Sequence, residues 1–301
     1  MSTLFSCTAS VLTLTLLAAP ALAGGSRGPD AQQGFLDLNG ARIHYVSQGS
    51  GTPLLLLHGY PLSGELFVRN RDALASAGFR VITVDHRGYG QSTAPADNPG
   101  DLATYAQDAL AVLDQLNVNK AVIGGMSMGG PIAFEMYRRA PERFSGLILI
   151  DTIANPASVV EQSLWKGMAQ KASMDGPQSL APELIKDMLT GMTRMNRPAD
   201  AKFLTGIVKQ ASVAADLAGA DVLATRPDSI PTLKTITVPT LILEGLEDTV
   251  YPPEFSMKMQ QNIAGSKLVI IPGAAHAAIY EKASAANRAI IDWARMHNLL
   301  R

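Results

Sequence analysis

The sequence predicts an α/β protein with a mostly parallel central sheet, helices on both faces of that sheet, and a helical cap inserted after the sixth strand. Three observations support this prediction. Short apolar runs, which are typical of strands buried on both faces, recur along the chain. Amphipathic segments with helical spacing separate these runs. The alternation stops for one long helical stretch and then resumes, which indicates an insertion into an α/β core.

The composition is that of a folded domain rather than a disordered chain. The 301 residues are 47% hydrophobic and 17% charged, and Lys+Arg 25 against Asp+Glu 26 gives a formal net charge of −1. This balance argues against a general nucleic-acid binder and against a polybasic membrane-surface protein. Cys7 is the single cysteine, which excludes a disulfide within the chain and a cysteine-rich zinc site.

The N-terminal segment has the features of a targeting sequence. Residues 1–23 contain no Asp, Glu, Lys or Arg, and an apolar run over residues 11–19 precedes the small-residue motif Ala21-Leu22-Ala23. We therefore predict a signal peptide over residues 1–23, cleavage near Ala23-Gly24, and a periplasmic or secreted mature protein. The run is shorter than the ~20 residues of a membrane span, so we expect no stable membrane insertion of the mature chain. Because a basic n-region is missing, a loosely anchored or disordered tail is the alternative.

The sheet is expected to open with an antiparallel pair. An alternating strand covers Ala41–Val46, and the turn dipeptide Asn39-Gly40 links it to a strand around Phe35. The later runs are continuous and apolar, as expected of parallel strands: Leu54–Leu57, Val81–Val84, Ala121–Ile123, Leu147–Ile150, Thr240–Leu243 and Leu268–Ile271.

Helical patterns fill the intervals between these strands. Asp101 is a suitable N-cap for a helix that runs to about Leu116. Residues 152–236 show helical patterns and no convincing strand, so we assign them to the cap and assign residues 24–151 and 237–301 to the core. The methionines of the cap either form an adaptable apolar binding surface or pack the cap's own interior; they are Met168, Met174, Met188, Met192 and Met195.

A Gly-x-Ser-x-Gly motif centred on Ser127 predicts a nucleophile. It lies between the strand Ala121–Ile123 and an expected helix over Pro131–Ala140, which is the strand–turn–helix context that the motif requires. A nucleophile on such a turn holds strained backbone angles, so Gly125 and Gly129 supply neighbours without bulk. The helix N-terminus also favours developing negative charge. A phosphate-binding loop is the alternative, but the Lys and Thr of a P-loop do not follow.

The serine needs a general base, and histidine suits this role because its pKa lies near neutrality. His276 follows the last strand, at the carboxyl edge where the sites of open α/β sheets gather. His44 lies inside a strand, and His297 lies near the end of the last helix. His58 and His86 lie at strand ends, so position alone does not exclude them. We predict His276 as the base.

The base in turn needs a carboxylate that orients it. Asp248 follows the strand Thr240–Leu243 at the same edge and is the predicted acid. Its competitors are Glu244 and Glu247 in the same loop, and Asp151 at the end of another strand.

Two backbone N–H donors should stabilise the oxyanion of an acyl-transfer reaction. One is the N–H of Met128, directly after the nucleophile. The other is expected from Tyr60, in the loop His58-Gly59-Tyr60-Pro61, where His58 should support the turn. This set of residues requires no metal and no organic cofactor.

These motifs resemble the α/β-hydrolase superfamily over essentially all of Gly34 to Arg301. The similarity rests on several segments: His58-Gly59-Tyr60-Pro61, Asp85 to Ser92, the elbow at Ser127, Asp248 followed by Pro252-Pro253, and Gly273-Ala274-Ala275-His276. The chain order of nucleophile, acid and base is the one that this resemblance implies. It also implies that Asp85, Arg87 and Ser92 are structural rather than catalytic.

Within the superfamily, the H-G-x-P form of the first loop is similar to that of bacterial arylesterases, cofactor-free haloperoxidases, enol-lactonases and epoxide hydrolases. Serine at the elbow differs from the aspartate that epoxide hydrolases use there. The resemblance therefore implies a hydrolase with a serine nucleophile.

Together the residues and the resemblance predict a serine hydrolase that cleaves a carboxylic ester or lactone with an apolar acyl part. Ser127 attacks the carbonyl, His276 transfers the proton, and Asp248 orients His276. The expected partner is this small-molecule substrate, and no nucleic acid. The alternatives are a C–C bond hydrolase, a perhydrolase or an acyltransferase with the same triad, and a non-catalytic ligand-binding protein with the same fold.

Overall fold

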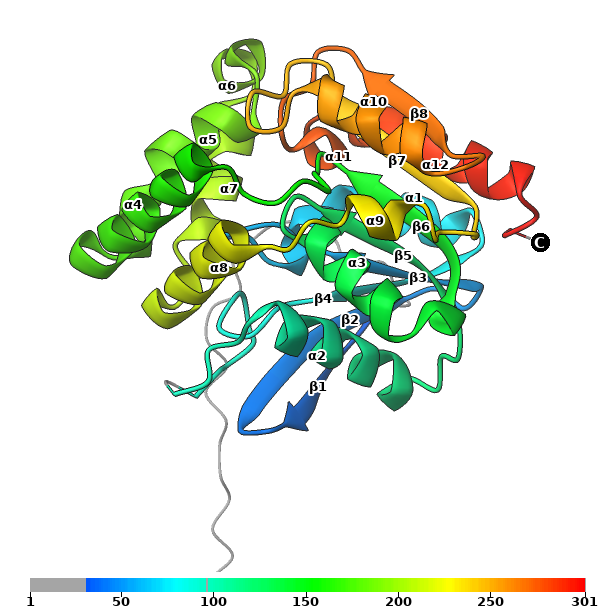
Figure 1. The fold of residues 1–301 in the computed structure, drawn as a ribbon, viewed down its shortest axis with the longest axis horizontal. Coiled ribbons are helices and arrows are strands. Elements are labelled where there is room, and N and C mark those ends of the chain that lie inside the picture. The colour runs from blue at the N-terminus through cyan, green and yellow to red at the C-terminus, as the bar shows by residue number, and fades with distance from the viewer. Residues whose placement is uncertain (1–30, 96, 301) are drawn as a thin grey trace, which may run out of the picture.

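An eight-stranded sheet forms the centre of the molecule in the computed structural model, which describes residues 31–95 and 97–300 (Figure 1). The predicted signal peptide over residues 1–23, its cleavage site and Cys7 lie outside the described residues. The strand order is β1-β2-β4-β3-β5-β6-β7-β8. The strands are β1 (Gln32–Leu38), β2 (Ala41–Gln48), β3 (Thr52–Leu57), β4 (Phe79–Val84), β5 (Ala121–Met126), β6 (Phe144–Ile150), β7 (Thr240–Gly245) and β8 (Lys267–Ile271).

The expected antiparallel opening of the sheet is confirmed. β1 and β2 pair antiparallel across Asn39 (φ 50°) and Gly40 (φ 79°), which both adopt the left-handed backbone that a tight hairpin turn needs. β2 is also antiparallel to β4, whereas every pairing from β4 to β8 is parallel. The parallel strands therefore end at one common edge.

β5 is longer than the apolar run that predicted it. It continues from Ile123 to Met126, because Gly124 and Gly125 still pair with β3 on one side and β6 on the other. Because glycine has no apolar side chain, the apolar run ended at Ile123 and did not indicate the last three residues of the strand. The following helix, α3 (Gly129–Arg139), accordingly begins before the expected Pro131.

Helices cover both faces of the sheet (Figure 1). α1 (Val68–Ser76) and α12 (Ala283–Met296) pack together on one face, and α2 (Leu102–Gln115), α3 and α10 (Pro253–Asn262) lie on the other. Asp101 caps α2 as predicted, since its side chain accepts a hydrogen bond from the N–H of Thr104 at 2.7 Å. Three short helices belong to the core, η1 (Gly64–Phe67), η2 (Pro141–Arg143) and α11 (Ala278–Glu281), and a fourth, α9 (Ile230–Leu233), lies at the end of the segment between β6 and β7. Within residues 31–95 and 97–300, no helix has the length and apolar character needed to cross a membrane.

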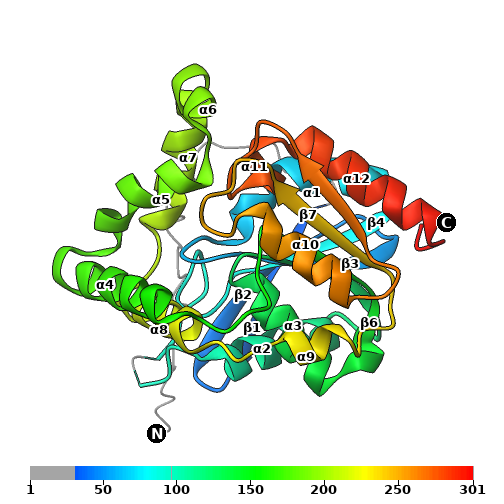
Figure 2. The same cartoon turned by 45° about the horizontal axis from the view of Figure 1, so that its top comes forward.

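The segment between β6 and β7 forms the predicted helical cap (Figure 2). Its helices are α4 (Val159–Asp175), η3 (Pro177–Leu180), α5 (Ala181–Met188), α6 (Gly191–Asn196), α7 (Pro198–Val208) and α8 (Val213–Thr225). Two cap methionines, Met168 and Met188, are buried, whereas Met174, Met192 and Met195 are exposed. The cap methionines therefore do not act as one group.

The central strands supply the most deeply buried part of the core. Leu55 of β3 is fully buried between β4 and β5. We expect Leu55→Ala to lower the free energy of unfolding by about 2–5 kcal/mol, because it removes buried methyl groups and leaves a cavity in a rigid sheet. Leu246→Ala is the matched control, since Leu246 is 51% exposed, and it should change stability by less than about 0.5 kcal/mol. Urea denaturation followed by circular dichroism measures both, and equal effects would contradict this view of the core.

Candidate active site

Ser127 lies on a sharp turn between β5 and α3. Its φ of 52° is in the left-handed region, which a residue with a side chain rarely adopts. The turn leaves no room for side chains at its neighbours: a Cβ on Gly125 would lie 2.1 Å from the carbonyl oxygen of Gly129, and one on Gly129 would lie 2.3 Å from that of Leu57. The N–H of Ser127 donates to the carbonyl of Ile150 at 3.0 Å. The neighbouring strand therefore holds the strained residue in place.

The structure brings Ser127, His276 and Asp248 into one hydrogen-bonded chain. His276 Nε2 lies 2.9 Å from Ser127 Oγ, and His276 Nδ1 lies 2.7 Å from Asp248 Oδ2. All three side chains are buried. Asp248 Oδ1 accepts the N–H groups of Val250 at 2.7 Å and Tyr251 at 3.1 Å. The carboxylate is thereby fixed, and it favours the His276 tautomer with a free Nε2 lone pair toward the serine hydroxyl.

The competing carboxylates have other contacts. Asp151 accepts the N–H of Gly245 at 2.8 Å and that of Ala278 at 2.9 Å, and so joins β6 to β7 and to α11. Glu247 is exposed. Glu244 is buried and accepts a hydrogen bond from the Ser256 hydroxyl. Asp248 is the carboxylate that contacts the histidine.

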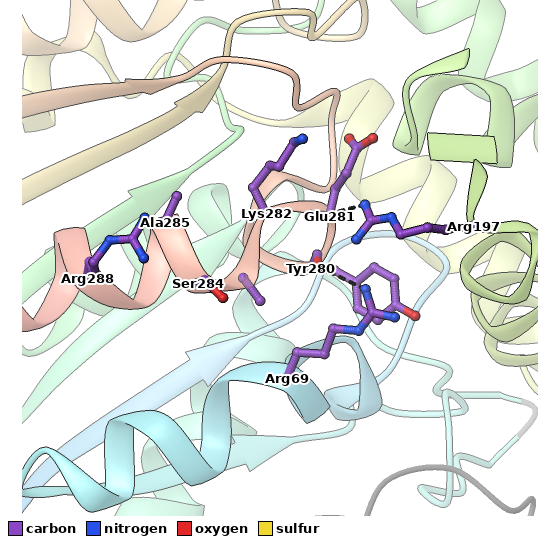
Figure 3. A pocket seen from close by; sticks show the side chains of 9 residues that line it. Arg69, Arg197, Tyr280, Glu281, Lys282, Ser284, Ala285 and Arg288 are labelled. Carbon is purple, nitrogen blue, oxygen red and sulfur yellow. Dashed lines mark hydrogen bonds between the residues drawn. The ribbon is translucent and has the colours of Figure 1, made fainter. Parts of the chain in front are cut away.

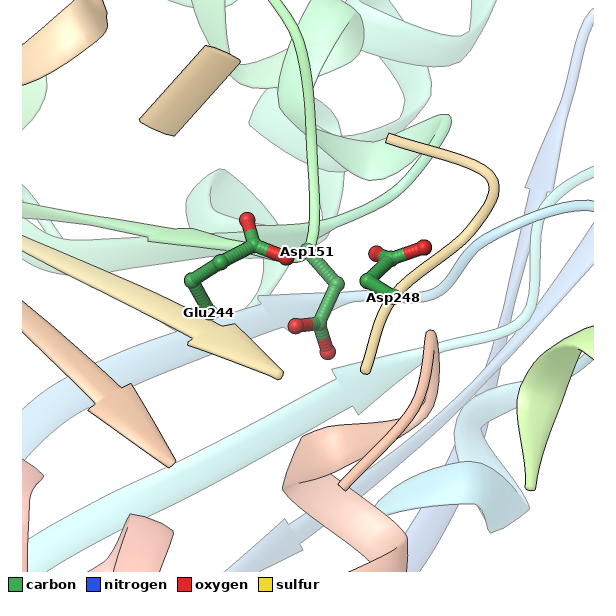
Figure 4. A group of neighbouring side chains, drawn as sticks. All are labelled: Asp151, Glu244 and Asp248. Carbon is green, nitrogen blue, oxygen red and sulfur yellow. The ribbon is translucent and has the colours of Figure 1, made fainter. Parts of the chain in front are cut away.

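Three buried carboxyl groups nevertheless lie side by side, and one of them is the Asp248 that contacts His276 (Figure 4). Asp151, Glu244 and Asp248 each offer an oxygen within 4.8 Å of the others. Burial, and after it the negative charge of Asp248, raises the pKa of Glu244 to about 9. Burial, followed by the charges of Glu244 and Asp248, also raises the pKa of Asp151 well above its usual range. Glu244 therefore holds a proton at neutral pH and adds no second charge beside Asp248.

The same oxygens are the group that could hold a metal ion within the described residues. Both oxygens of Asp151 and both of Asp248 already accept hydrogen bonds from backbone N–H groups or from His276. Glu244 keeps one oxygen, Oε1, without a partner in this part of the chain. One free oxygen is a poor match to the several oxygen ligands that a hard cation takes.

The predicted oxyanion donors come from two loops that meet at the nucleophile. A Cβ on Gly59 would lie 2.8 Å from Ser127 Cβ, so the loop after β3 runs directly against the serine. Within residues 31–95 and 97–300, the backbone hydrogen bonds outside helices and strands use neither the N–H of Tyr60 nor that of Met128. Both N–H groups are thus available to a carbonyl oxygen placed at Ser127.

His58 supports this loop, as the sequence predicted. Its Nδ1 lies 2.9 Å from the carbonyl oxygen of Gly59, and its Nε2 accepts the N–H of His86 at 3.0 Å. Burial lowers the pKa of His58 to about 4, so the ring is neutral and donates from Nδ1. His58 therefore joins the loop after β3 to the loop after β4.

The side chains of Asp85, Arg87 and Ser92 make contacts that hold the core together. Asp85 Oδ2 lies 2.9 Å from His44 Nδ1, and the Ser92 hydroxyl donates to the Asp85 carbonyl at 2.7 Å. Arg87 forms a buried ion pair with Asp108. These contacts agree with the structural role that the resemblance implied.

The cap reaches the catalytic loop through its backbone. The carbonyl oxygen of Asp187 accepts the N–H of His276 at 3.2 Å, and that of Met188 accepts the N–H of Ala277 at 3.0 Å. The sequence does not predict this contact, because every residue has a backbone carbonyl group and nothing marks the two that accept these hydrogen bonds. The end of α5 therefore positions the histidine loop.

A hollow whose lining includes arginine and lysine side chains lies between cap and core (Figure 3). Ser127 is not among its lining residues. Arg69 of α1 and Arg197 both form ion pairs with Asp200 of α7. The Arg69 guanidinium lies 4.1 Å from the ring centroid of Tyr280, and Arg197 donates to the carbonyl of Glu281 at 2.9 Å. These two arginines thus connect α7 to the core.

The chain is similar to known proteins over most of its length. Residues 52–283 match the protein family described as alpha/beta hydrolase fold. The chain is 32% identical over 255 residues to the AB hydrolase superfamily protein YisY of Bacillus subtilis, covering 81% of this chain and 92% of that protein. It is 28% identical over 292 residues to a 2-hydroxy-6-oxononadienedioate/2-hydroxy-6-oxononatrienedioate hydrolase of a Pseudomonas species, covering 90% and 97%. A solved thermophilic esterase from Thermogutta terrifontis is similar with a TM-score of 0.82 at 31% identity, covering 88% of this chain and 99% of that one.

The proton on Glu244 gives a prediction for stability against pH. An acid whose pKa is raised by folding stabilises the folded state at low pH, and this contribution is lost as the pH rises from the usual value of 4.5 to about 9. Glu244→Gln, which keeps a neutral group in place, should therefore lose less stability than the wild type between pH 5 and pH 9. Melting temperatures across this range measure the difference. Glu247→Gln, at an exposed position, is the control, and parallel curves for Glu244→Gln and the wild type would refute the protonated state.

Proposed function

The chain belongs to the alpha/beta hydrolase family, and we propose that it is a serine hydrolase that cleaves a carboxylic ester or a lactone with an apolar acyl part. Ser127 is the nucleophile, His276 the general base and acid, and Asp248 the orienting carboxylate. The backbone N–H groups of Tyr60 and Met128 form the oxyanion hole. No metal or organic cofactor takes part in the proposed steps.

One observation carries the proposal: the continuous hydrogen-bonded chain from Ser127 Oγ through His276 to Asp248. His276 Nε2 takes the hydroxyl proton as Oγ attacks the carbonyl carbon. The proton then passes from Nε2 to the leaving alcohol, and the acyl group remains on Oγ. Water enters by the reverse roles and releases the acid. Throughout the cycle, Asp248 stabilises the imidazolium that forms twice.

The thermophilic esterase supports the ester-cleaving form of this chemistry, since it is 31% identical over nearly its whole length. The Pseudomonas relative, a hydrolase of 2-hydroxy-6-oxononadienedioate by its name, supports a second candidate. This is a C–C bond hydrolase that uses the same three residues. The two candidates differ in the bond that is broken at the carbonyl carbon: a C–O bond in the ester or lactone hydrolase, and a C–C bond in the second candidate.

The cap supports the apolar acyl part of the proposal. Trp165 and Met168 of α4 are buried, and the Trp165 ring lies 5.8 Å from that of Tyr60 in an edge-on arrangement. Tyr60 belongs to the loop that runs against Ser127. Apolar surface of the cap thus continues toward the nucleophile.

We also propose that the mature chain acts in the periplasm or outside the cell. This part rests on the sequence of residues 1–23 alone, with its apolar run and the motif Ala21-Leu22-Ala23.

A fluorophosphonate probe tests the nucleophile. Ser127 Oγ should attack its phosphorus and displace fluoride, which leaves a phosphonylated serine in the wild type, and Ser127→Ala should abolish labelling and lower ester turnover by more than about 10^4-fold. Ser173→Ala, an exposed serine of α4, is the matched control and should label normally. Intact-mass spectrometry reads the adduct. Equal labelling of Ser127→Ala and wild type would exclude this serine as the nucleophile.

A turnover screen tests the substrate class. We expect hydrolysis of p-nitrophenyl esters and of lactones, with kcat/KM rising as the apolar acyl chain lengthens, because each buried methylene adds roughly 0.8 kcal/mol of binding. Spectrophotometric rates measure this trend. Acceptance of charged substrates alone would contradict the apolar preference, and cleavage of vinylogous diketones without ester turnover would favour the C–C hydrolase.

A further inference from the structure

Asp216 of the cap helix α8 is a buried carboxyl group that the proposed mechanism does not use. Its exposed fraction is 0%, and among the described residues neither of its carboxylate oxygens has a hydrogen-bond partner. A polar group buried without a partner is costly, and such groups in native proteins call for an explanation. Asp216 is therefore a group for which this part of the chain supplies no partner.

Asp216 lies on the face of α8 that packs against the catalytic loops. Gly219 is one turn further along and shares this face, and a Cβ on Gly219 would lie 2.2 Å from the Tyr89 hydroxyl and 2.8 Å from Tyr60 Cδ2. The Tyr89 hydroxyl also donates to the carbonyl of Ala215 at 2.7 Å. This face of α8 thus covers the ring of Tyr60, whose backbone N–H is the proposed oxyanion donor. Figure 2 shows α8 beside α4 in the cap.

Donors without partners surround the same place. The Tyr60 hydroxyl, the Trp165 Nε1–H and the Tyr105 hydroxyl are buried, and none has a hydrogen-bond partner among the described residues. The Trp165 ring is 5.8 Å from that of Tyr60. After burial, the charges of Asp216 and then Tyr105 are the causes that raise the pKa of Tyr60. Buried donors and a buried acceptor, each without a partner among the described residues, thus belong to residues at or next to this contact between α8, α4 and the loop of Tyr60.

The hydrogen-bonding capacities of these side chains indicate which ligand group could bind to all of them. An indole N–H donates only, and an ionised carboxylate accepts only. A hydroxyl group satisfies both at once, because it donates to a carboxylate and accepts from an indole or phenol. An ammonium group donates only, so it would leave Trp165 Nε1 without an acceptor. Burial raises the pKa of Asp216 to about 7, and a hydroxyl group suits both forms, since it can also accept from the protonated acid.

We propose that Asp216 binds a hydroxyl group of the substrate, with Tyr60 and Trp165 as accompanying donors. This inference rests on the proposed esterase or lactonase function and narrows its substrate class. The substrate is an ester or lactone whose acyl chain is apolar next to the carbonyl and carries a hydroxyl group further along. Tyr60 sets the spacing, because its backbone lies at Ser127 and its ring lies under α8. We therefore expect several bonds between the hydroxyl group and the carbonyl, and an optimum at an intermediate chain length.

Matched pairs of p-nitrophenyl esters test the proposal: alkanoates of increasing length, each with its ω-hydroxy and its ω-amino counterpart. The measured quantity is the ratio of kcat/KM for the hydroxy ester to that for the plain ester. In the wild type this ratio should exceed one at an intermediate length and fall for shorter chains. Asp216→Leu should lower it by about tenfold or more through the hydroxy ester alone, as expected for a lost hydrogen bond to a charged group.

Asp221→Leu is the matched control, because Asp221 lies on the same helix and is exposed; it should leave the ratio unchanged. If the leucine variant does not fold, the same ratio is measured with Asp216→Asn, which keeps the shape of the side chain. A wild-type ratio at or below one at every length overturns the proposal without any variant. Preference for the amino ester overturns it in favour of a cationic substrate. Failure of the proposed function is distinct, since it would show as absent turnover of all esters and absent fluorophosphonate labelling.

Discussion

The left-handed backbone at Ser127 is the constraint on which the rest of the site depends. The turn is possible only because Gly125 and Gly129 have no side chains: a Cβ on either would lie within 2.3 Å of a backbone carbonyl oxygen. Strain of this kind persists only where the surroundings fix it. Here the end of β6 and the residues just after it fix the turn: Ser127 N–H donates to the carbonyl of Ile150, and the Thr152 hydroxyl donates to the Ser127 carbonyl. The parallel sheet therefore holds the serine hydroxyl toward His276.

The protonation of the carboxyl groups near His276 determines the charge available to the histidine. A buried carboxylate must stay ionised to stabilise an imidazolium, yet two further carboxyl groups lie beside it. Burial and mutual repulsion keep Glu244 protonated, and Asp151 is pushed in the same direction. Asp248 differs from both because one of its oxygens contacts His276, while the other accepts two backbone N–H groups. Hydrogen bonds to His276 and to two backbone N–H groups thus stabilise the charge of Asp248, and the proton on Glu244 removes a second charge beside it.

The cap contacts the core at several points, one of which is the loop that contains His276. Backbone carbonyls at the end of α5 hold the loop of His276, and the N–H of Ser212, just before α8, donates to the carbonyl of Gly88 at 2.9 Å. The ion pairs of Asp200 secure α7 at a third point. A cap held at these points has a defined position over the core. In the proposed function, core residues perform the chemistry, and the proposed role of Asp216 assigns part of the substrate selection to the cap.

The sequence alone predicted the candidate triad of a serine, an aspartate and a histidine, each shortly after an apolar run, but it left other carboxylates as competitors of Asp248. Apolar runs mark buried strands, and residues after parallel strands share one edge, so the spacing of the runs is enough to place Ser127, Asp248 and His276 together. The end of β5 could not be placed, because Gly124 and Gly125 have no side chains to show a pattern. Only the tertiary structure decided which carboxylate contacts the histidine, that Glu244 is crowded enough to keep its proton, and that Asp216 lies beside Tyr60. These properties depend on distances between segments far apart in the chain and on the exclusion of water, and neither is encoded in local spacing.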